Sequence, residues 1–351
     1  MQKRVASILG AALVLGLAGC KPPAPEPGKG SQGSPGGKLS LSVGLVTDSG
    51  GIDDMSFNAS AWAGLQAVAR ETGVSTRYLE SHEQSDYKGN LASLADQGVD
   101  LVFAVGFLME DALKEVAPRY PKVKFAIIDG NAPDLPNCVS IKFREEQGCF
   151  LAGYLAARMS KTGAIGFVGG MEGALIKKFE VGYRAGARTA NPSIRVIPKY
   201  VGNFVDLPRG KEYAEAEFRN GADIVFQAAG KAGLGVLDAA VDQGPGSYAI
   251  GVDADQDHIH PGRILTSMMK GVDSAVASTV KKLVSGQWKA GSDTLGLKEK
   301  GVRLSPMKYT RKDVPADVLT KLDAAAAMIV DGQLVVPTTE ADIQNFIPPK
   351  L

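Results

Sequence analysis

Several features are scarce in this chain of 351 residues, and each scarcity argues against a class of function. The formal net charge is only +1 and charged residues make up 22% of the chain, so the balance indicates neither a nucleic-acid-binding surface nor an acidic tail. Beyond the N-terminal segment, no stretch approaches the run of apolar residues that a membrane-spanning helix requires. The chain is long enough for two domains of ordinary size.

Residues that commonly carry covalent catalysis or bind metal ions are also scarce. The chain has three histidines and three cysteines, and no serine or cysteine lies in a nucleophile-elbow sequence. The segment 255–260, DQDHIH, is either a fragment of a metal site or a polar hinge loop, and we favour the loop. The acidic pair Asp53 and Asp54 lacks the ordered ligand spacing of a calcium loop. We therefore expect no catalytic residue, no bound metal and no cofactor.

The first twenty residues are typical of a lipoprotein signal peptide. Lys3 and Arg4 precede an apolar segment, Val5–Leu17, that is too short to span a membrane. The following Leu-Ala-Gly-Cys resembles the bacterial lipobox, whose cysteine, here Cys20, is lipidated after cleavage. The alternative is an ordinary secretory signal. Residues 21–38, rich in proline, glycine and serine, predict a flexible tether between the lipid and a folded body.

Two cysteines remain once Cys20 is assigned to a lipid. An oxidising compartment would allow Cys138 and Cys149 to form a disulfide. We expect Cys138 on a strand and Cys149 on the helix that follows it, and this placement does not decide between a disulfide and two buried thiols.

The stretch Val43–Asn58 organises the folded part of the chain. Its apolar start predicts a buried parallel strand, two adjacent glycines predict a tight turn, and a helical pattern follows. In open α/β sheets, ligands bind at such turns. This turn carries three carboxylates, Asp48, Asp53 and Asp54, whereas a phosphate site would be basic. It therefore predicts a ligand that donates hydroxyl or amino groups.

Strands and helices alternate along the rest of the chain, which predicts parallel sheets with right-handed crossovers. The segment 164–170 repeats the order of a strand followed by two glycines, so we expect two similar halves that face each other across a cleft. Spacing alone does not place the segments after residue 300. The strands are expected at 43–46, 77–79, 100–106, 124–130, 139–143, 164–170, 194–200, 222–230, 248–253 and 264–270, with helices over 86–97, 110–116, 145–159 and 272–283.

Charged side chains follow several of these strands. Asp48, Asp129 and Asp253 each lie at an expected carboxyl end, and they come from both halves, so they would converge on the cleft. Carboxylates there could accept paired hydrogen bonds from a diol such as ribose, although helix capping also explains an aspartate at this position. Lys270 follows another strand and is either a site residue that neutralises a carboxylate or a solvated surface lysine.

Two aromatic residues stand in equivalent places in the two halves. Phe57 and Phe179 each lie near the start of a helix after a glycine-rich turn. They could enclose a flat ring between them, and the alternative is that both pack in the core.

Four motifs behind LAGC carry a family resemblance: TDSGGIDDMSFN (Thr47–Asn58), GFVGG (Gly166–Gly170), GVDADQ (Gly251–Gln256) and SMMKGVD (Ser267–Asp273). In this order they resemble the basic membrane protein family of bacterial lipoproteins, which includes purine nucleoside receptors of ABC transporters. The resemblance covers roughly residues 41–304. It implies an α/β fold of the type I periplasmic binding protein class, with two Rossmann-like lobes, three crossings and a ligand cleft between the lobes. We expect the first lobe at 39–142 plus about 257–290, and the second at 143–256 plus about 291–351.

The resemblance also implies roles for the residues on the base side of a nucleoside. Phe57 and Phe179 would stack on the base, and Asn58 with Asp48 would read its edge. Asp54 could replace Asp48 in that reading.

On the sugar side, the resemblance implies that Asp129, Asp253 and Lys270 hold the ribose hydroxyls. Gly230 would let the backbone approach the sugar. The chain is thus expected to be a monomeric, lipid-anchored solute-binding protein at the cell membrane, facing the periplasm or the outside. It would deliver nucleosides, with purines favoured, to an ABC permease without catalysis.

Two other functions remain open from the sequence. The same fold could bind a different ligand, such as a sugar, a thiamine-like base or a signalling molecule. A calcium-dependent nucleoside hydrolase would require the aspartates to hold calcium and activate water. A transcription repressor of the same fold is disfavoured by the lipobox and by the lack of a helix-turn-helix pattern.

Overall fold

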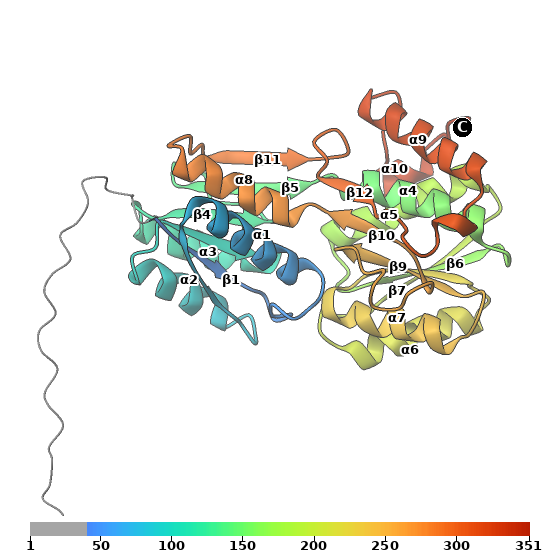
Figure 1. Cartoon of the computed structure of the whole chain (residues 1–351), viewed down its shortest axis with the longest axis horizontal. Coiled ribbons are helices and arrows are strands. Elements are labelled where there is room, and N and C mark those ends of the chain that lie inside the picture. The colour runs from blue at the N-terminus through green and yellow to red at the C-terminus, as the bar shows by residue number, and fades with distance from the viewer. Residues whose placement is uncertain (1–40) are drawn as a thin grey trace, which may run out of the picture. The chain divides into compact units, whose positions relative to one another are not determined.

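The computed structural model describes residues 41–351, so the expectations for the signal peptide, Cys20 and the tether lie outside the described residues. The described part contains two six-stranded sheets (Figure 1). The first is parallel throughout, in the order β11-β5-β4-β3-β1-β2. Its strands are β1 (Ser42–Val46), β2 (Ser75–Leu79), β3 (Leu101–Val105), β4 (Lys124–Ile128), β5 (Cys138–Phe143) and β11 (Gly291–Leu295).

The second sheet repeats this arrangement in the order β12-β10-β9-β8-β6-β7. Only β12 runs antiparallel to its neighbour, β10. In both sheets the strand order reverses beside the first strand, between β1 and β3 and between β6 and β8, as in doubly wound folds. The strands are β6 (Ala164–Gly169), β7 (Arg195–Tyr200), β8 (Ile224–Ala228), β9 (Tyr248–Asp253), β10 (Ile264–Lys270) and β12 (Val302–Leu304).

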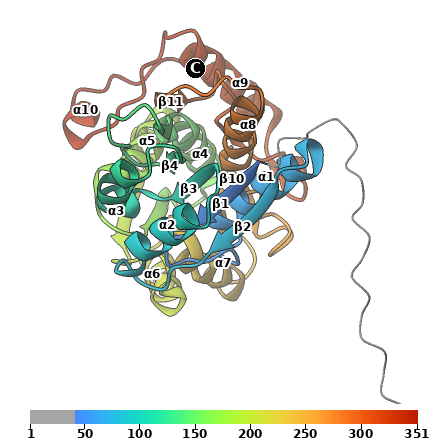
Figure 2. The same cartoon turned by 90° about the vertical axis from the view of Figure 1, so that its left-hand side faces the viewer.

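Helices cover both faces of each sheet. Figure 2 shows α2 and α3 on one side of the first sheet and α1 and α8 on the other. The main helices are α1 (Phe57–Thr72), α2 (Asp86–Asp96), α3 (Glu110–Val116), α4 (Glu145–Met159), α5 (Ala174–Ala190), α6 (Leu207–Arg219), α7 (Gly233–Asp242), α8 (Val272–Val284), α9 (Ala316–Val330) and the short α10 (Glu340–Gln344). None of the helices described within residues 41–351 combines the length and apolar character needed to cross a bilayer.

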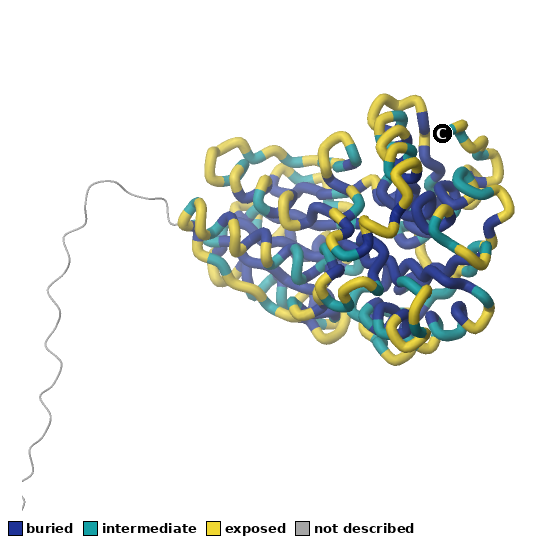
Figure 3. The backbone as a smooth tube through the Cα atoms, turned by 45° about the vertical axis from the view of Figure 1, so that its right-hand side comes forward, coloured by how far each residue is buried: buried dark blue, intermediate teal, exposed yellow. Residues whose placement is uncertain are grey.

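The sequence of β3 shows why both faces are covered. All five of its residues are buried, and alternate side chains belong to different core clusters. Buried backbone likewise fills the interior of the molecule (Figure 3). Phe103 packs in the cluster shared with α1, whereas Val102 and Ala104 pack in the cluster shared with α2 and α3. Because successive side chains of a strand point to opposite faces, an uninterrupted apolar run requires cover on both sides.

The chain crosses between the two lobes three times: from β5 to α4, from β10 to α8 and from β11 to β12. Helix α8 belongs with the first sheet because it packs tightly on α1. A Cβ atom added at Gly64 of α1 would lie 2.3 Å from the carbonyl oxygen of Asp273 in α8.

The strand pairing differs from the lobe boundaries expected from the sequence. The expected first-lobe segment, about 257–290, includes β10, but β10 pairs with β9 and β12 in the second sheet. Conversely β11, expected in the second lobe, pairs with β5 in the first. The segment 255–260 joins β9 to β10 within one sheet, so the expectation that it is a hinge loop is wrong. The apolar pattern of a buried strand is compatible with either sheet, so only its pairing with neighbouring strands shows to which sheet it belongs.

Helices α4 and α5 are in backbone contact through glycines. A Cβ atom at Gly186 would lie 1.8 Å from the carbonyl oxygen of Phe150, and one at Gly182 would lie 2.5 Å from that of Glu146. No side chain fits at such distances, so glycine is required at both places. The contact fixes the start of α4 against α5.

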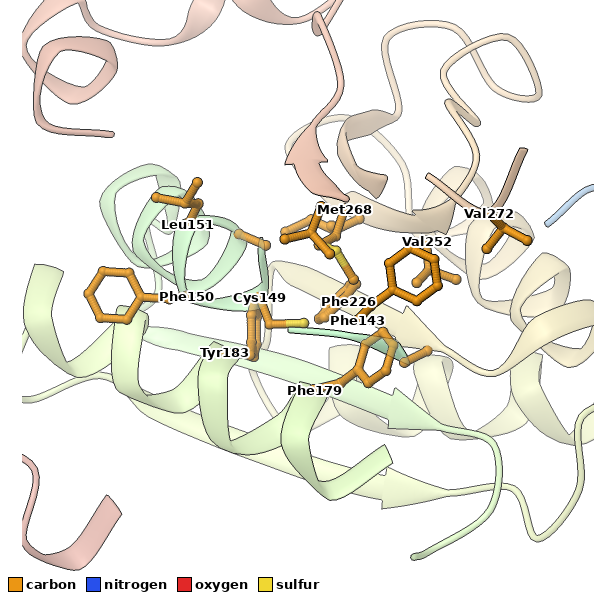
Figure 4. Close-up of a cluster of buried hydrophobic side chains, with 14 of the residues drawn as sticks. Phe143, Cys149, Phe150, Leu151, Phe179, Tyr183, Phe226, Val252, Met268 and Val272 are labelled. Atoms are coloured by element: carbon orange, nitrogen blue, oxygen red, sulfur yellow. The ribbon is translucent and has the colours of Figure 1, made fainter. Parts of the chain in front are cut away.

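The two described cysteines are free thiols in different parts of the core. Cys138 packs with the α2–α3 side of the first sheet, and Cys149 packs in the cluster between α4 and α5 (Figure 4). Burial raises the pKa of Cys138 to about 11. Of the two possibilities left open by the sequence, the structure therefore has two buried thiols.

Candidate ligand-binding site

A pocket of about 610 Å³, its open mouth included, lies where the carboxyl ends of the two sheets face each other. This is the position at which doubly wound folds bind ligands. The pocket brings together all eight residues selected from the sequence, namely Asp48, Phe57, Asn58, Asp129, Phe179, Gly230, Asp253 and Lys270. Whether they contact a ligand is part of the proposal below.

Asp54 lines the pocket but acts as the cap of helix α1. Its Oδ1 atom accepts hydrogen bonds from the backbone N–H groups of Ser56 and Ala59, both at 2.9 Å. Its Oδ2 atom accepts from the backbone N–H of Asn58 at 2.8 Å and from the Asn58 side chain at 3.0 Å. Both oxygens are therefore engaged at a helix N-terminus, where a carboxylate is favourable. This arrangement leaves Asp54 little capacity to replace Asp48 in reading a ligand.

The side chain of Asn58 is also fully engaged. Its amide group donates to Asp48 Oδ1 at 2.8 Å and to Asp54, and its oxygen accepts from the backbone N–H of Asp48 at 3.3 Å. An amide has two N–H donors, and both are used here. Asn58 therefore holds Asp48 in place, and Asp48 presents the remaining acceptor on this wall.

Asp48 has one oxygen committed to the protein and one directed at the pocket. Oδ1 accepts from Gly50 N–H at 2.9 Å as well as from Asn58. No hydrogen bond among the described residues reaches Oδ2, which lies 3.5 Å from where a Cβ atom on Gly106 would be. Burial raises the pKa of Asp48 to about 6, and the bonds from Gly50 and Asn58 limit the rise. At neutral pH, Oδ2 is thus an ionised acceptor.

The opposite end of the pocket holds a buried ion pair. The Lys270 ammonium group bonds to Asp129 Oδ2, and their side chains are 1% and 6% exposed. The other oxygen, Asp129 Oδ1, is buried without a hydrogen-bond partner. Asp253, from the second lobe, accepts from Ser56 Oγ of the first lobe at 2.6 Å. Asp129 and Asp253 have φ angles of 65° and 63°, and such left-handed backbone in non-glycine residues is concentrated at functional sites.

The charges at this end depend on burial and on Lys270. Burial raises the pKa of Asp129 to about 6 and that of Asp253 to about 7, against the opposing charge of Lys270. Burial by itself would lower the pKa of Lys270, but the surrounding carboxylates outweigh it and raise that pKa above its usual value. Lys270 is therefore a permanent cation beside carboxylates that titrate close to neutral pH.

Aromatic rings surround the Lys270 ammonium group. It lies 5.3 Å from the ring centre of Phe57, 5.6 Å from that of Phe179 and 4.9 Å from that of Phe143, within the range of cation–π attraction. Phe57 is half-buried, whereas Phe179 is only 3% exposed and belongs to the core cluster in Figure 4. Phe179 thus combines the two alternatives considered from the sequence: it packs in the core and also lines the pocket.

Comparison with known proteins gives the family. A family model described as "ABC transporter substrate-binding protein PnrA-like" matches residues 41–338. The chain belongs to this family. It is therefore a substrate-binding protein of the ABC-transporter type, with the type I periplasmic binding protein fold, and its work is binding rather than catalysis.

Individual relatives of this PnrA-like protein match over nearly their full length. Basic membrane protein A1 of Borrelia garinii subsp. bavariensis is 36% identical over 91% of this chain and 94% of the relative. The ABC transporter nucleoside-binding protein BmpA of Lactococcus lactis subsp. cremoris is 35% identical over 96% of this chain and 100% of the relative. A crystal structure of an ABC-transporter solute-binding protein from Aeropyrum pernix K1 matches with a TM-score of 0.79 and 29% identity, covering 87% of this chain and 96% of that one.

The pocket of this PnrA-like protein also contains residues that the sequence analysis missed. Phe107, just after β3, and Phe204, after β7, meet edge-to-face across the pocket with ring centres 6.2 Å apart. Lys231 of the second lobe bonds to Asp53 of the first at 2.9 Å. Phe107 follows an apolar strand and a glycine, which is a recognisable signal, but Phe204 lies in a loop whose pattern gives none.

The histidines of segment 255–260 have partners other than a metal. His258 Nδ1 lies 3.1 Å from the carbonyl oxygen of Asp255, and His260 Nε2 lies 2.7 Å from Asp238 Oδ1. Among residues 41–351, no three histidine, cysteine, aspartate or glutamate side chains are grouped closely enough to hold a metal ion.

Proposed function

We propose that this substrate-binding protein captures nucleosides in the pocket between its lobes, with purine nucleosides favoured, and delivers them to an ABC permease. The observation that carries the proposal is the pair of uncommitted carboxylate oxygens, Asp129 Oδ1 and Asp48 Oδ2, at opposite ends of an aromatic-lined pocket. A ligand that fits this pattern has donors at both ends and a flat apolar surface between them. A nucleoside meets this description, with ribose hydroxyls at one end and base N–H groups at the other.

The ribose would bind at the Asp129 end. Asp129 Oδ1, a buried acceptor without a partner, would accept a hydroxyl hydrogen, and burying it unpaired costs about 1–3 kcal/mol. Asp253 would accept from the neighbouring hydroxyl, and an N–H of Lys270 that is not bonded to Asp129 would donate to a hydroxyl oxygen. Gly230 adopts φ 56° at the pocket wall and leaves room for the sugar beside its backbone.

The base would bind at the Asp48 end. Asp48 Oδ2 accepts and cannot donate when ionised, so it selects a base edge that carries an N–H group. Phe57 from the first lobe and Phe179 from the second would face the two sides of the base, since both line the pocket. Asn58 would act through its two bonds to Asp48 rather than by contact with the base.

Delivery to a permease requires that the protein stay near a membrane. Cys20 in the Leu-Ala-Gly-Cys sequence is proposed as the lipidated residue, with 21–38 as the tether. The protein would then act as a monomer on the outer side of the cytoplasmic membrane. Closure of the lobes on the ligand would be the signal that the permease recognises.

Calorimetric titration with nucleosides tests the proposal. The protein is first stripped of bound ligand by unfolding and refolding, then titrated with adenosine, guanosine, inosine, uridine and ribose. We expect micromolar or tighter binding of at least one purine nucleoside, weaker binding of uridine and no heat from ribose. Absence of heat with every nucleoside would refute the assignment while leaving the family and fold unchanged, and the co-purified ligand would then be identified by mass spectrometry.

A further inference from the structure

Glu145 lies behind the pocket at the first crossing between the lobes. It is the first residue of α4, and a single residue, Arg144, separates it from the end of β5. Its side chain is 1% exposed and does not line the pocket. A buried carboxylate is costly unless it is paired, so its partners indicate why it is there.

The two oxygens of Glu145 meet two different lysines. Oε1 lies 3.0 Å from Lys270 Nζ, and Oε2 accepts from Lys178 Nζ at 2.6 Å. Lys178 also donates to the carbonyl oxygen of Phe143, the last residue of β5, at 3.0 Å. Glu145 therefore connects a pocket-lining residue of β10 with helix α5 and with the end of β5.

The charges around Glu145 keep its carboxylate ionised, whereas that of its neighbour Asp129 titrates closer to neutral pH. Burial would raise the pKa of Glu145, but the charges of Lys270 and Lys178 outweigh burial and hold that pKa below its usual value. Asp129, which shares Lys270, has its pKa raised to about 6 by burial, and the negative charge of Glu145 adds to the rise. Glu145 thus keeps the charge of Lys270 balanced even when Asp129 binds a proton.

The geometry also limits the directions open to Lys270. An ammonium group has three N–H donors, of which one bonds to Asp129, while Glu145 Oε1 lies 3.0 Å away as an ion pair that lacks hydrogen-bond geometry. The two carboxylates therefore hold the ammonium group from two sides and leave an N–H donor for the pocket. Without Glu145, the flexible lysine side chain would have one fixed partner and a larger choice of orientations.

The backbone contact between α4 and α5 makes this arrangement rigid. A Cβ atom at Gly182 of α5 would lie 2.5 Å from the carbonyl oxygen of Glu146, so the first turn of α4 rests directly on α5. Lys178 precedes Phe179, and both project from α5 toward this region. The position of Glu145 is therefore set by the second lobe, although it follows a strand of the first.

We propose that Glu145 is a positioning residue for the ligand pocket: it touches no ligand, holds the Lys270 ammonium group in place beside Asp129, and ties the first crossing to the pocket wall. The part of Lys270 in holding a sugar rests on the proposed function. The contacts of Glu145 with Lys270 and Lys178 do not depend on which ligand binds.

The neighbouring residue, Glu146, supplies a matched control. It lies in the same helical turn, is 5% exposed, and has its nearest cation contact at 3.6 Å, to Lys178. Glu145→Gln and Glu146→Gln each remove one buried negative charge from the start of α4 without changing side-chain size. Only the first removes a partner of Lys270.

Titration calorimetry and carboxyl NMR on the two variants test the role. We expect Glu145→Gln to weaken binding of the best purine nucleoside on the order of tenfold or more at pH 7.5, and Glu146→Gln to change it less than about twofold. In the ligand-free protein labelled with 13C at aspartate carboxyl groups, Glu145→Gln is expected to lower the pKa of Asp129, because a negative neighbour is removed. The Asp129 signal is assigned with Asp129→Asn.

The other charged groups near these residues do not reverse that expectation. Lys270 from β10 and Lys178 from α5 both favour ionised Asp129, and Asp253, the last residue of β9, has its own pKa raised to about 7. On α4 itself, Glu146 and Cys149 face Glu145. All of these groups are unchanged in Glu145→Gln, so the shift at Asp129 reports on Glu145.

Several outcomes would overturn the inference. Equal effects of the two variants on affinity would do so, as would an affinity loss in Glu145→Gln with no change in the Asp129 titration, since a purely structural role predicts that pattern. Should Glu145→Gln fail to fold, Glu145→Asp keeps the charge but draws it back from Lys270 and Asp129, and we expect weaker binding with a smaller fall in the pKa of Asp129; an unchanged Asp129 titration would again count against the role. A wild-type protein that binds no nucleoside would refute the proposed function alone, because the ligand-free titration still tests Glu145.

Discussion

Asp48→Asn is the substitution that most directly tests how the pocket recognises a base. Oδ1 of Asp48 accepts from Gly50 and Asn58, so the oxygen of the new amide would keep this place and its NH₂ group would take the place of Oδ2. An acceptor directed at the pocket thus becomes a donor. A base N–H that bonded to Asp48 would now face another N–H.

The size of the effect follows from the bond that is lost. A hydrogen bond to a charged group contributes about 1.5–3 kcal/mol, and the unpaired donors left behind add to the loss. We expect affinity for inosine, guanosine or adenosine to fall by about 3 kcal/mol, roughly 100-fold in Kd. The ligand-free protein should not lose stability, because the rise in the pKa of Asp48 from 3.8 to about 6 corresponds to an order-of-magnitude cost of ~3 kcal/mol for keeping it ionised in the fold.

The assay measures the binding of inosine and of purine riboside to the wild type and to Asp48→Asn by titration calorimetry. Purine riboside, whose base has no N–H group, serves as the ligand that lacks the donor, and the substitution should weaken its binding far less. Asp53→Asn is the matched control: the side chain is 73% exposed in the same loop, and we expect less than about a threefold change. The reasoning would be refuted if Asp48→Asn bound inosine as tightly as the wild type does, or if it lost as much affinity for purine riboside as for inosine. A fall in melting temperature that matches the lost affinity would also refute it.

Three further predictions concern pH, closure and packing. The native pKa values of Asp48, Asp129 and Asp253 lie near 6 to 7, above their unfolded values, so the folded state binds more protons than the unfolded state between about pH 4 and 7. The unfolding free energy of the ligand-free protein should therefore rise from pH 8 to 5, which thermal melts at each pH would measure. Nucleoside affinity should fall over the same range, because the carboxylates lose their charge, and calorimetry at each pH would measure it. Lys231→Ala removes a partly exposed bond between the lobes, so small-angle scattering should show a modest increase in the open population, with a change of no more than about 1 kcal/mol in unfolding free energy. Gly186→Ala would place Cβ 1.8 Å from a backbone oxygen of α4 and should lower the melting temperature by several degrees, whereas Gly89→Ala, with no atom within 4 Å, should leave it unchanged or higher; similar melting temperatures would contradict the close-packing argument.

The carboxyl ends of the strands, and the charged residues located there, were predicted well from the sequence. Asp129 and Asp253 stand directly after apolar runs, and a residue at a strand end is fixed by the strand itself. The sequence analysis placed β10 in the wrong lobe because the apolar run ILTSMMK would be buried in either sheet; its partners are β9, the preceding strand, and β12, which follows after two intervening elements. Local pattern determines an element, but the partners of that element are set by the packing of the whole fold.

The side chains of the site likewise include some that the sequence pattern identifies and others that only the three-dimensional structure identifies. Asp48 was placed at the cleft from the sequence, but the commitment of Asp54 to helix capping and of the Asn58 side chain to Asp48 and Asp54 appears only when three-dimensional distances are known. Phe204 lies in a loop and Glu145 behind the pocket, and neither has a pattern that distinguishes it from an ordinary residue. Both gain their significance from residues far away in the chain.

The excess of negative charge around the pocket affects which ligands it can accept, in particular those that carry a phosphate group. Four buried carboxylates line it, those of Asp48, Asp54, Asp129 and Asp253, and Lys270 is the one buried cation among its lining residues in 41–351. A phosphate group on the sugar would add like charge at close range, at about 3 kcal/mol for each pair 5 Å apart in an effective dielectric of 20. If the ligand is a nucleoside, as proposed, the pocket would therefore disfavour nucleotides electrostatically, and uptake through it would depend on phosphatases that release the free nucleoside first.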